Sequence, residues 1–258
     1  MPIQSESALI LAAAVVPPVV FALVALRAGG GRAVGLADVG AFLWGVLVAP
    51  VAATLMNDAL GAWTTRALGD ATAGWFVPTM VAPLVEEGVK GMGVALVLTL
   101  APGPNASVPG GILTGALVGL GFAATENVTY YTLAAVQAGY TGLGRAVYLR
   151  GVVEGLNHAA FTAATGAGIA WGRRRGRTLA LGLAGFAVAV FAHAGWNGVT
   201  SRVITAALCN APTPGGACAL APAATDLFVT APLLVVASIG PLALGLGLFA
   251  RRARRARA

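Results

Sequence analysis

Three charged residues lie where a membrane would normally exclude them. Glu86, Glu87 and Lys90 fall inside an apolar run that extends from residue 75 to residue 100. A charge at the centre of a bilayer costs about 2.5–3.5 kcal/mol on insertion scales, so such residues face protein or water and often mark function. On a helix, Glu86 and Lys90 share a face and can pair, whereas Glu87 points toward a neighbouring helix. The plainer alternative is a buried ion pair that only holds two helices together.

Further ionisable and amide side chains lie inside later apolar runs. In chain order they are Glu126 and Asn127 in the run 111–136, His158 in the run 151–172, and His193 and Asn197 in the run 178–203. The two histidines are the only ones in the chain. With a rise of about 1.5 Å per residue, Glu86, Glu126 and the two histidines lie roughly 10–17 Å below the same membrane face. Four helices are therefore expected to bring ionisable groups to one layer.

Two imidazoles and a carboxylate are the ligand set of a hydrolytic zinc site that keeps one position open for water. On this interpretation Glu126, His158 and His193 are the metal ligands and Glu86 is the general base. A metal-free alternative uses the same residues, with a buried carboxylate beside Glu87 activating water while histidine and asparagine side chains stabilise the oxyanion. Both alternatives remain open at this stage.

The composition indicates a membrane protein. Of the 258 residues, 58% are hydrophobic and 10% are charged, and the mean hydropathy is +0.84. An ordinary soluble domain carries about 25% charged residues. The net charge of +7 does not favour a nucleic-acid partner, because the arginines cluster at the ends of apolar runs, as the positive-inside rule requires.

Seven apolar runs are long enough to cross a hydrocarbon core of ~30 Å, which takes about 20 residues. They lie at roughly 7–26, 34–56, 75–100, 111–136, 151–172, 178–203 and 225–250. The predicted fold class is an all-α, polytopic transmembrane bundle of about seven helices, forming a single integral membrane domain over residues 1–258. The segment 57–74 could form an interfacial helix.

The arginines determine the predicted orientation. Eleven of the 16 basic residues, in the segments 27–32, 173–177 and 251–257, fall on one side of a seven-helix bundle. The positive-inside rule then places the amino terminus outside and the carboxy terminus in the cytoplasm. The basic tail, residues 251–258, is expected to lie on anionic lipid. Cys209 and Cys218 would face the outside, where a disulfide can form, and two free thiols are the alternative.

Four motifs on successive helices resemble those of the PrsW family of intramembrane proteases. They are Glu-Glu-x-x-Lys at 86–90, Phe-x-x-x-Glu-Asn at 122–127, His-x-x-Phe-Thr at 158–162 and His-x-x-x-Asn at 193–197. That family is similar in turn to the CAAX prenyl endopeptidases and to bacteriocin-processing membrane enzymes. Where the CAAX-type relatives have a histidine in the second motif, this chain has Glu126, which favours the PrsW branch.

The resemblance implies an intramembrane endopeptidase, either a metalloprotease or a glutamate protease, in a bacterial plasma membrane. Its catalytic core would be the helices of residues 86–197. Its substrate would be a membrane-spanning protein or peptide, an anti-sigma factor in the best-known role, cleaved near the outer half of the bilayer. Zinc is the cofactor expected for the metalloprotease form, and no cofactor for the glutamate form. Carried over by position, the catalytic residues are Glu86, Glu87, Glu126, His158, His193 and Asn197, with Lys90 and Asn127 in support.

Two other classes of protein remain open. Intramembrane Glu, Lys and His also build the proton relays of ion-coupled transporters. Against a transporter, the chain shows no repeated halves, and its polar residues form a cluster rather than a path across the bilayer. In a non-catalytic membrane scaffold, the same cluster would only determine helix packing.

One further carboxylate has two open roles. Glu154 is one helical turn from His158 and could orient its ring. It is also four residues from Arg150 and could form an ion pair with it.

Overall fold

The computed structural model describes residues 3–28, 34–101, 103–200 and 231–255, and the regular structure of these residues is entirely helical. This confirms the predicted all-α class. The helices follow one another as α1 (Ile3–Ala28), α2 (Leu36–Leu43), η1 (Trp44–Val48), α3 (Ala49–Leu68), α4 (Asp70–Phe76), η2 (Val77–Val81), α5 (Ala82–Leu100), η3 (Pro104–Ala106), α6 (Val108–Ala146), η4 (Val147–Val153), α7 (Asn157–Arg174), α8 (Thr178–Gly195), η5 (Trp196–Thr200) and α10 (Ala231–Arg255).

Long apolar helices support the membrane location. Four helical stretches of the described chain can cross a membrane by length and composition, namely Glu6–Arg27, Leu36–Leu68, Val108–Arg174 and Thr178–Gly198. α5 is not among them, since it carries three charged side chains within 19 residues. The count of seven spans and the orientation of the termini stay predictions. The cysteine loop and the end of the basic tail lie outside the described residues.

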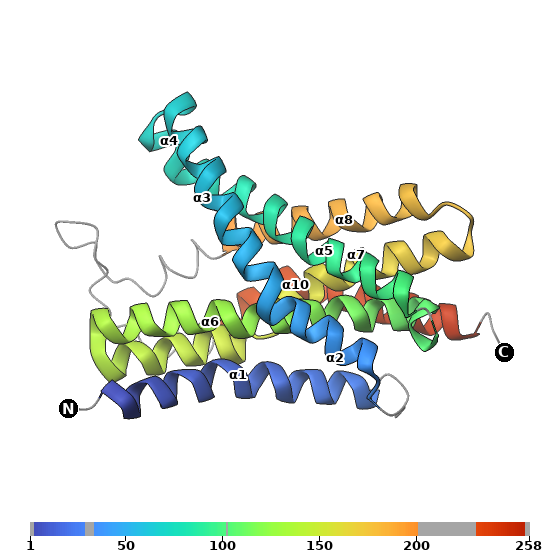
Figure 1. The fold of residues 1–258 in the computed structure, drawn as a ribbon, viewed down its shortest axis with the longest axis horizontal. Helices are drawn as coiled ribbons and strands as arrows, with labels where there is room; N and C mark the ends of the chain where they lie inside the picture. Colours follow the sequence, from blue (N-terminus) through green and yellow to red (C-terminus); the bar gives the residue numbers. More distant parts are fainter. Residues whose placement is uncertain (1–2, 29–33, 102, 201–230, 256–258) are drawn as a thin grey trace.

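Figure 1 shows helices running back and forth along the long axis of the molecule. α6 turns back on itself at Ala138 and Gly139, whose backbone angles leave the helical region. Gly139 has φ +58°, a conformation that glycine adopts without steric cost. We call residues 140–153, the end of α6 and η4, the return limb. The turn is tight, because a Cβ added to Gly142 would lie 2.4 Å from the carbonyl oxygen of Ala134.

Glycines let α6 and α7 approach backbone to backbone. A Cβ added at Gly119 would lie 2.2 Å from the carbonyl oxygen of His158, and one at Gly115 would lie 2.4 Å from that of Thr162. A Cβ added at Gly111 would likewise lie 2.4 Å from the carbonyl oxygen of Gly166. Rows of small residues are a common means of close helix packing in membranes. This row on α6 therefore sets the position at which α7 presents His158.

Gly119→Ala is expected to lower the free energy of unfolding by about 1–3 kcal/mol, because the added methyl group has no room and α7 must shift. The thermal unfolding midpoint in detergent measures this loss. Gly88→Ala on α5 is the matched control, since nothing lies within 4 Å of a Cβ at Gly88. Equal midpoints for the two variants would contradict the packing described above.

Helix boundaries differ from the expected ones in two places. α3 continues to Leu68, so the expected interfacial helix is instead divided between α3 and α4 at Gly69, which has φ +78°. The fifth apolar run, 151–172, is not one continuous helix, because residues 154–156 form a turn between η4 and α7. His158 therefore lies in the first turn of α7 rather than in the middle of a helix.

Candidate active site

Four helices bring the predicted polar layer together. α5 packs against α6, α7 and α8, and side-chain hydrogen bonds connect these helices to one another. The ionisable side chains come from α5 (Glu86, Glu87 and Lys90), α6 (Glu126), α7 (His158) and α8 (His193).

Glu87 and Lys90 form the fully buried centre of the cluster. Both side chains have 0% exposure, and Lys90 Nζ lies 2.8 Å from Glu87 Oε1. Thr162 Oγ1 donates a hydrogen bond of 2.8 Å to Glu87 Oε2. Lys90 Nζ also lies 3.3 Å from Glu86 Oε2 and 3.9 Å from the centre of the Phe122 ring. Buried charges are tolerated when they are paired and hydrogen-bonded, and this pair meets both conditions.

Each imidazole is held by a carboxylate through one ring nitrogen. His193 Nδ1 donates to Glu87 Oε1 over 3.1 Å, which directs the other ring nitrogen, Nε2, toward Glu86. Lys90 can only donate, so His158 Nδ1 accepts from Nζ over 3.1 Å. His158 Nε2 then donates to Glu126 Oε2 over 2.9 Å. Carboxylates in this position fix the tautomer and the orientation of a histidine, so Glu87 and Glu126 act as orienting groups.

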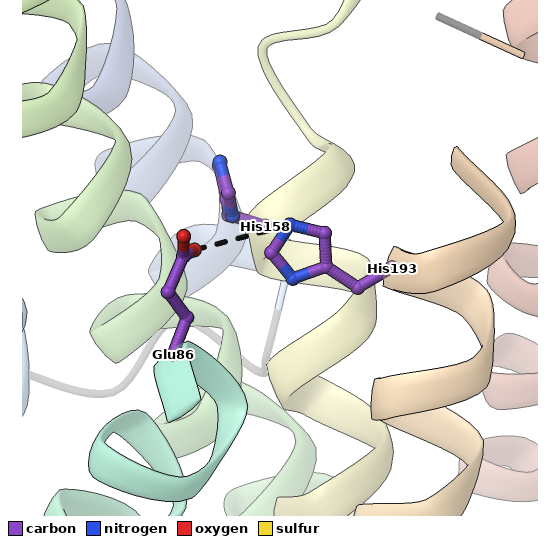
Figure 2. A group of neighbouring side chains, drawn as sticks. All are labelled: Glu86, His158 and His193. Atoms are coloured by element: carbon purple, nitrogen blue, oxygen red, sulfur yellow. Dashed lines mark ion pairs between the residues drawn. The ribbon is translucent and has the colours of Figure 1, made fainter. Parts of the chain in front are cut away.

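Glu86 is the least restrained carboxylate of the cluster. Among the described residues its hydrogen bonding is limited to the 3.3 Å contact with Lys90. His193 Nε2 lies 3.8 Å from Glu86 Oε2, which is too far for a direct hydrogen bond. Figure 2 shows Glu86 on α5 facing His193 on α8, with His158 beside them. A carboxylate beside an imidazole nitrogen that makes no hydrogen bond to any described residue suits proton transfer or metal ligation.

The residues fit a hydrolytic metal site. Glu86, His158 and His193 each offer a ligand atom, and the three atoms lie within 4.8 Å of one another. Two imidazoles oriented by carboxylates, with a third carboxylate, match the donors of a zinc site that leaves a position for water. In this set Glu86 takes the place predicted for Glu126, whose carboxylate bonds to His158. Lys90 Nζ donates a hydrogen bond to Nδ1 of His158, so the lysine ammonium group and a metal ion would compete for that nitrogen.

Arg150 belongs to the cluster, although the sequence placed it only beside Glu154. Its Nη2 donates to Glu126 Oε2 over 2.6 Å, and its Nε donates to Asn127 Oδ1 over 3.1 Å. The guanidinium lies 3.7 Å from the centre of the Tyr130 ring. Arg150 therefore pairs with Glu126 rather than with Glu154. Arg150 lies directly before the apolar run that carries His158, at an expected helix end, so no signal in the sequence indicated a place in the site.

Asn197 bonds to η2 rather than to its neighbour on the helix face, His193. Its Nδ2 donates to the carbonyl oxygen of Pro78 over 3.0 Å. In the π-helical pattern of η2 this carbonyl would accept from residue 83. That residue is Pro83, which has no N–H to donate. Asn197 supplies the missing donor and connects η5, which follows α8, to the segment that precedes Glu86.

This arrangement is that of a polytopic helical membrane protein with a buried carboxylate and imidazole centre. Residues 37–236 match the family described as PrsW family intramembrane metalloprotease. The match covers most of the chain and all the predicted site residues, so the chain belongs to this family, as its four motifs indicated. No curated protein and no solved structure matches the chain.

Proposed function

We propose that the chain is an intramembrane endopeptidase in which Glu86 is required to activate the attacking water. The observation that best supports this is a contrast between carboxylates. Glu87 and Glu126 are occupied by hydrogen bonds that orient the two imidazoles, whereas Glu86 keeps a single hydrogen bond within the described chain, to Lys90, and lies 3.8 Å from Nε2 of His193. Membership of a protease family supports the same reaction.

In the proposed reaction Glu86 accepts a proton from water as the water oxygen bonds to the scissile carbonyl carbon. The carbon–nitrogen bond then breaks, and the proton passes from Glu86 to the departing amine. Lys90, 3.3 Å from Glu86, keeps a positive charge beside the ionised carboxylate. A metal ion held by Glu86, His158 and His193 would supply Lewis-acid activation of the water, with Glu86 then a ligand. Glu86 is required in either form.

The proposed partners follow from the place of the site among helices that can cross a membrane. The substrate is a membrane-spanning protein or peptide of a bacterial plasma membrane, such as the anti-sigma factor that the family resemblance implies, cut near the outer half of the bilayer. It must unwind locally, because intrahelical hydrogen bonds shield its peptide groups. The exposed Arg251 and Arg252 at the end of α10 would lie on anionic lipid. No nucleic-acid partner is proposed.

The test uses the full chain in lipid nanodiscs with a fluorescent Leu/Ala transmembrane peptide whose helix is interrupted by an off-centre Gly-Pro pair, here called the broken-helix peptide. We expect mass spectrometry to find two fragments with the wild type and none with Glu86→Gln. An intact peptide, or fragments from both proteins, would contradict the proposal. A proton flux across liposomes that Glu86→Gln abolishes, without cleavage, would instead support a transporter.

Metal content tests the ligand set. After equilibration with zinc and removal of the excess, we expect about one ion per wild-type chain and none in Glu86→Gln or His193→Ala. Glu126→Gln should still take up zinc, with an affinity lowered about 10–100-fold, because its carboxylate orients His158. Elemental analysis measures the content. Loss of zinc in Glu126→Gln with full retention in Glu86→Gln would contradict this set and favour the one predicted from the sequence.

A further inference from the structure

The cluster is more accessible on one side than on the other. The exposed fraction of the side chain is at most 3% for Glu87, Lys90 and His193, and it rises to 13% for His158, 21% for Glu126 and 22% for Arg150. Tyr130, which lies under the guanidinium, is 44% exposed. Arg150, on the return limb, is therefore the most exposed charged side chain of the cluster.

Arg150 is held by two side-chain hydrogen bonds, and other N–H groups of its guanidinium make none with the described residues. Two of its N–H groups bond to Glu126 and Asn127, and Tyr130 lies against its face. A guanidinium has five N–H donors and no acceptor. Its Nη1 has no hydrogen-bond partner among the residues that the structure describes. Three donors therefore make no hydrogen bond within the described part of the chain, on a side chain that is 22% exposed.

The backbone around Arg150 holds it in this place. The turn at Ala138 and Gly139 sends the return limb back along α6, and η4 carries Arg150 in wide π-helical turns, which are frequent at functional sites. A Cβ on Gly151 would lie 2.8 Å from the hydroxyl oxygen of Tyr131. The limb therefore packs closely on α6, and the position of Arg150 is determined by packing as well as by its hydrogen bonds.

We infer that Arg150 binds the main chain of the substrate beside the scissile bond, an inference that rests on the proposed endopeptidase function. A segment that unwinds in a membrane exposes carbonyl oxygens, and each unsatisfied group costs several kcal/mol in hydrocarbon. Arg150 offers donors where these acceptors would pass, and its planar fork can bond two oxygens at once. The ligand is an extended peptide segment, recognised because it is unwound rather than by its side chains.

Arg150→Lys tests this role, because lysine keeps the positive charge but cannot hold Glu126 and Asn127 and also present a planar fork. With the broken-helix peptide in nanodiscs we expect KM to rise at least about tenfold and kcat to fall less than about threefold. In the Glu86→Gln background, fluorescence anisotropy should show the same loss of peptide binding. Arg145→Lys, on the same limb, is the matched control and should keep the wild-type KM.

The outcomes separate this inference from the proposed function. A wild-type KM in Arg150→Lys, with cleavage intact, would overturn the inference and leave the endopeptidase standing. A fall in kcat and in the thermal unfolding midpoint at constant KM would also overturn it, since Arg150 would then only position Glu126. Absence of cleavage by the wild type would overturn the proposed function and the inference together.

Discussion

Glu86→Gln is expected to reduce kcat by about 10²–10⁴-fold, the range over which general acid–base groups contribute. Glutamine has the shape of glutamate but accepts no proton at neutral pH, and it is a poor metal ligand. The fold should survive, because Glu86 makes a single hydrogen bond of 3.3 Å among the described residues, with Lys90, and the other contacts of Lys90 remain. The measurements are turnover of the broken-helix peptide and the thermal unfolding midpoint.

A matched control separates chemistry from charge. Asp58→Asn makes the same carboxylate-to-amide change at an exposed position of α3 and should leave turnover and unfolding unchanged. The Glu86→Gln protein should also bind the peptide with wild-type affinity, because the reacting group rather than the binding surface is altered. Turnover near that of the wild type in Glu86→Gln would contradict the role of Glu86 in both the metal-dependent and the metal-free reaction.

Glu87→Ala is expected to act on stability first, with a loss of about 3–5 kcal/mol, the cost of removing one partner from a buried ion pair. The side chain is fully buried, and its two oxygens accept hydrogen bonds from Lys90, Thr162 and His193. Its removal leaves the ammonium group of Lys90 short of a counter-charge and frees the His193 ring. The thermal unfolding midpoint and the yield of monodisperse protein measure the effect.

Asp58→Ala is the control for Glu87→Ala, because it removes an exposed carboxylate from α3 and should change the free energy of unfolding by less than about 0.5 kcal/mol. The loss in free energy of unfolding for Glu87→Gln should lie between the losses for Glu87→Ala and Asp58→Ala, since the amide oxygen can still accept one of the hydrogen bonds. If Glu87→Ala unfolded at the same midpoint as Asp58→Ala, the buried centre described here would be wrong.

The convergence of the polar layer could be predicted because it depends on regular geometry. Charged residues stand out in an apolar sequence, and the constant rise of a helix gives their depth. Glu86, Glu126, His158 and His193 meet in the structure for this reason. The motifs added the order of the helices and led to the correct family.

The division of roles within the layer could not be predicted, because it depends on how each helix is rotated about its axis. The sequence does not show that Glu87 bonds to His193 while Glu126 bonds to His158. Because of these pairings, the candidate metal set contains Glu86 in place of the predicted Glu126.

The contacts of Arg150 and Asn197 could not be predicted from the sequence for a different reason. Arg150 reaches Glu126 because the chain reverses at Gly139. Gly139 lies between two apolar runs, where the sequence indicates a connection between helices and not a helical limb that returns to the site. Asn197 is four residues from His193, a spacing that puts two residues on one face of a regular helix. Its side chain instead donates to the carbonyl oxygen of Pro78, for which Pro83 has no N–H. Both cases involve a local departure from regular helix geometry.

The most direct test of the central claim is to map where a single-span substrate is cut in a bacterial membrane. Two substrates would be co-expressed with the protein, their orientation set by flanking lysines and arginines, with a Gly-Pro pair in the outer half of one span and in the inner half of the other. We predict that mass spectrometry will find a cut inside the outer-half span, and none with Glu86→Gln. Cleavage outside the span, or equal cleavage of the two substrates, would contradict an active site built around Glu86 in the outer half of the bilayer.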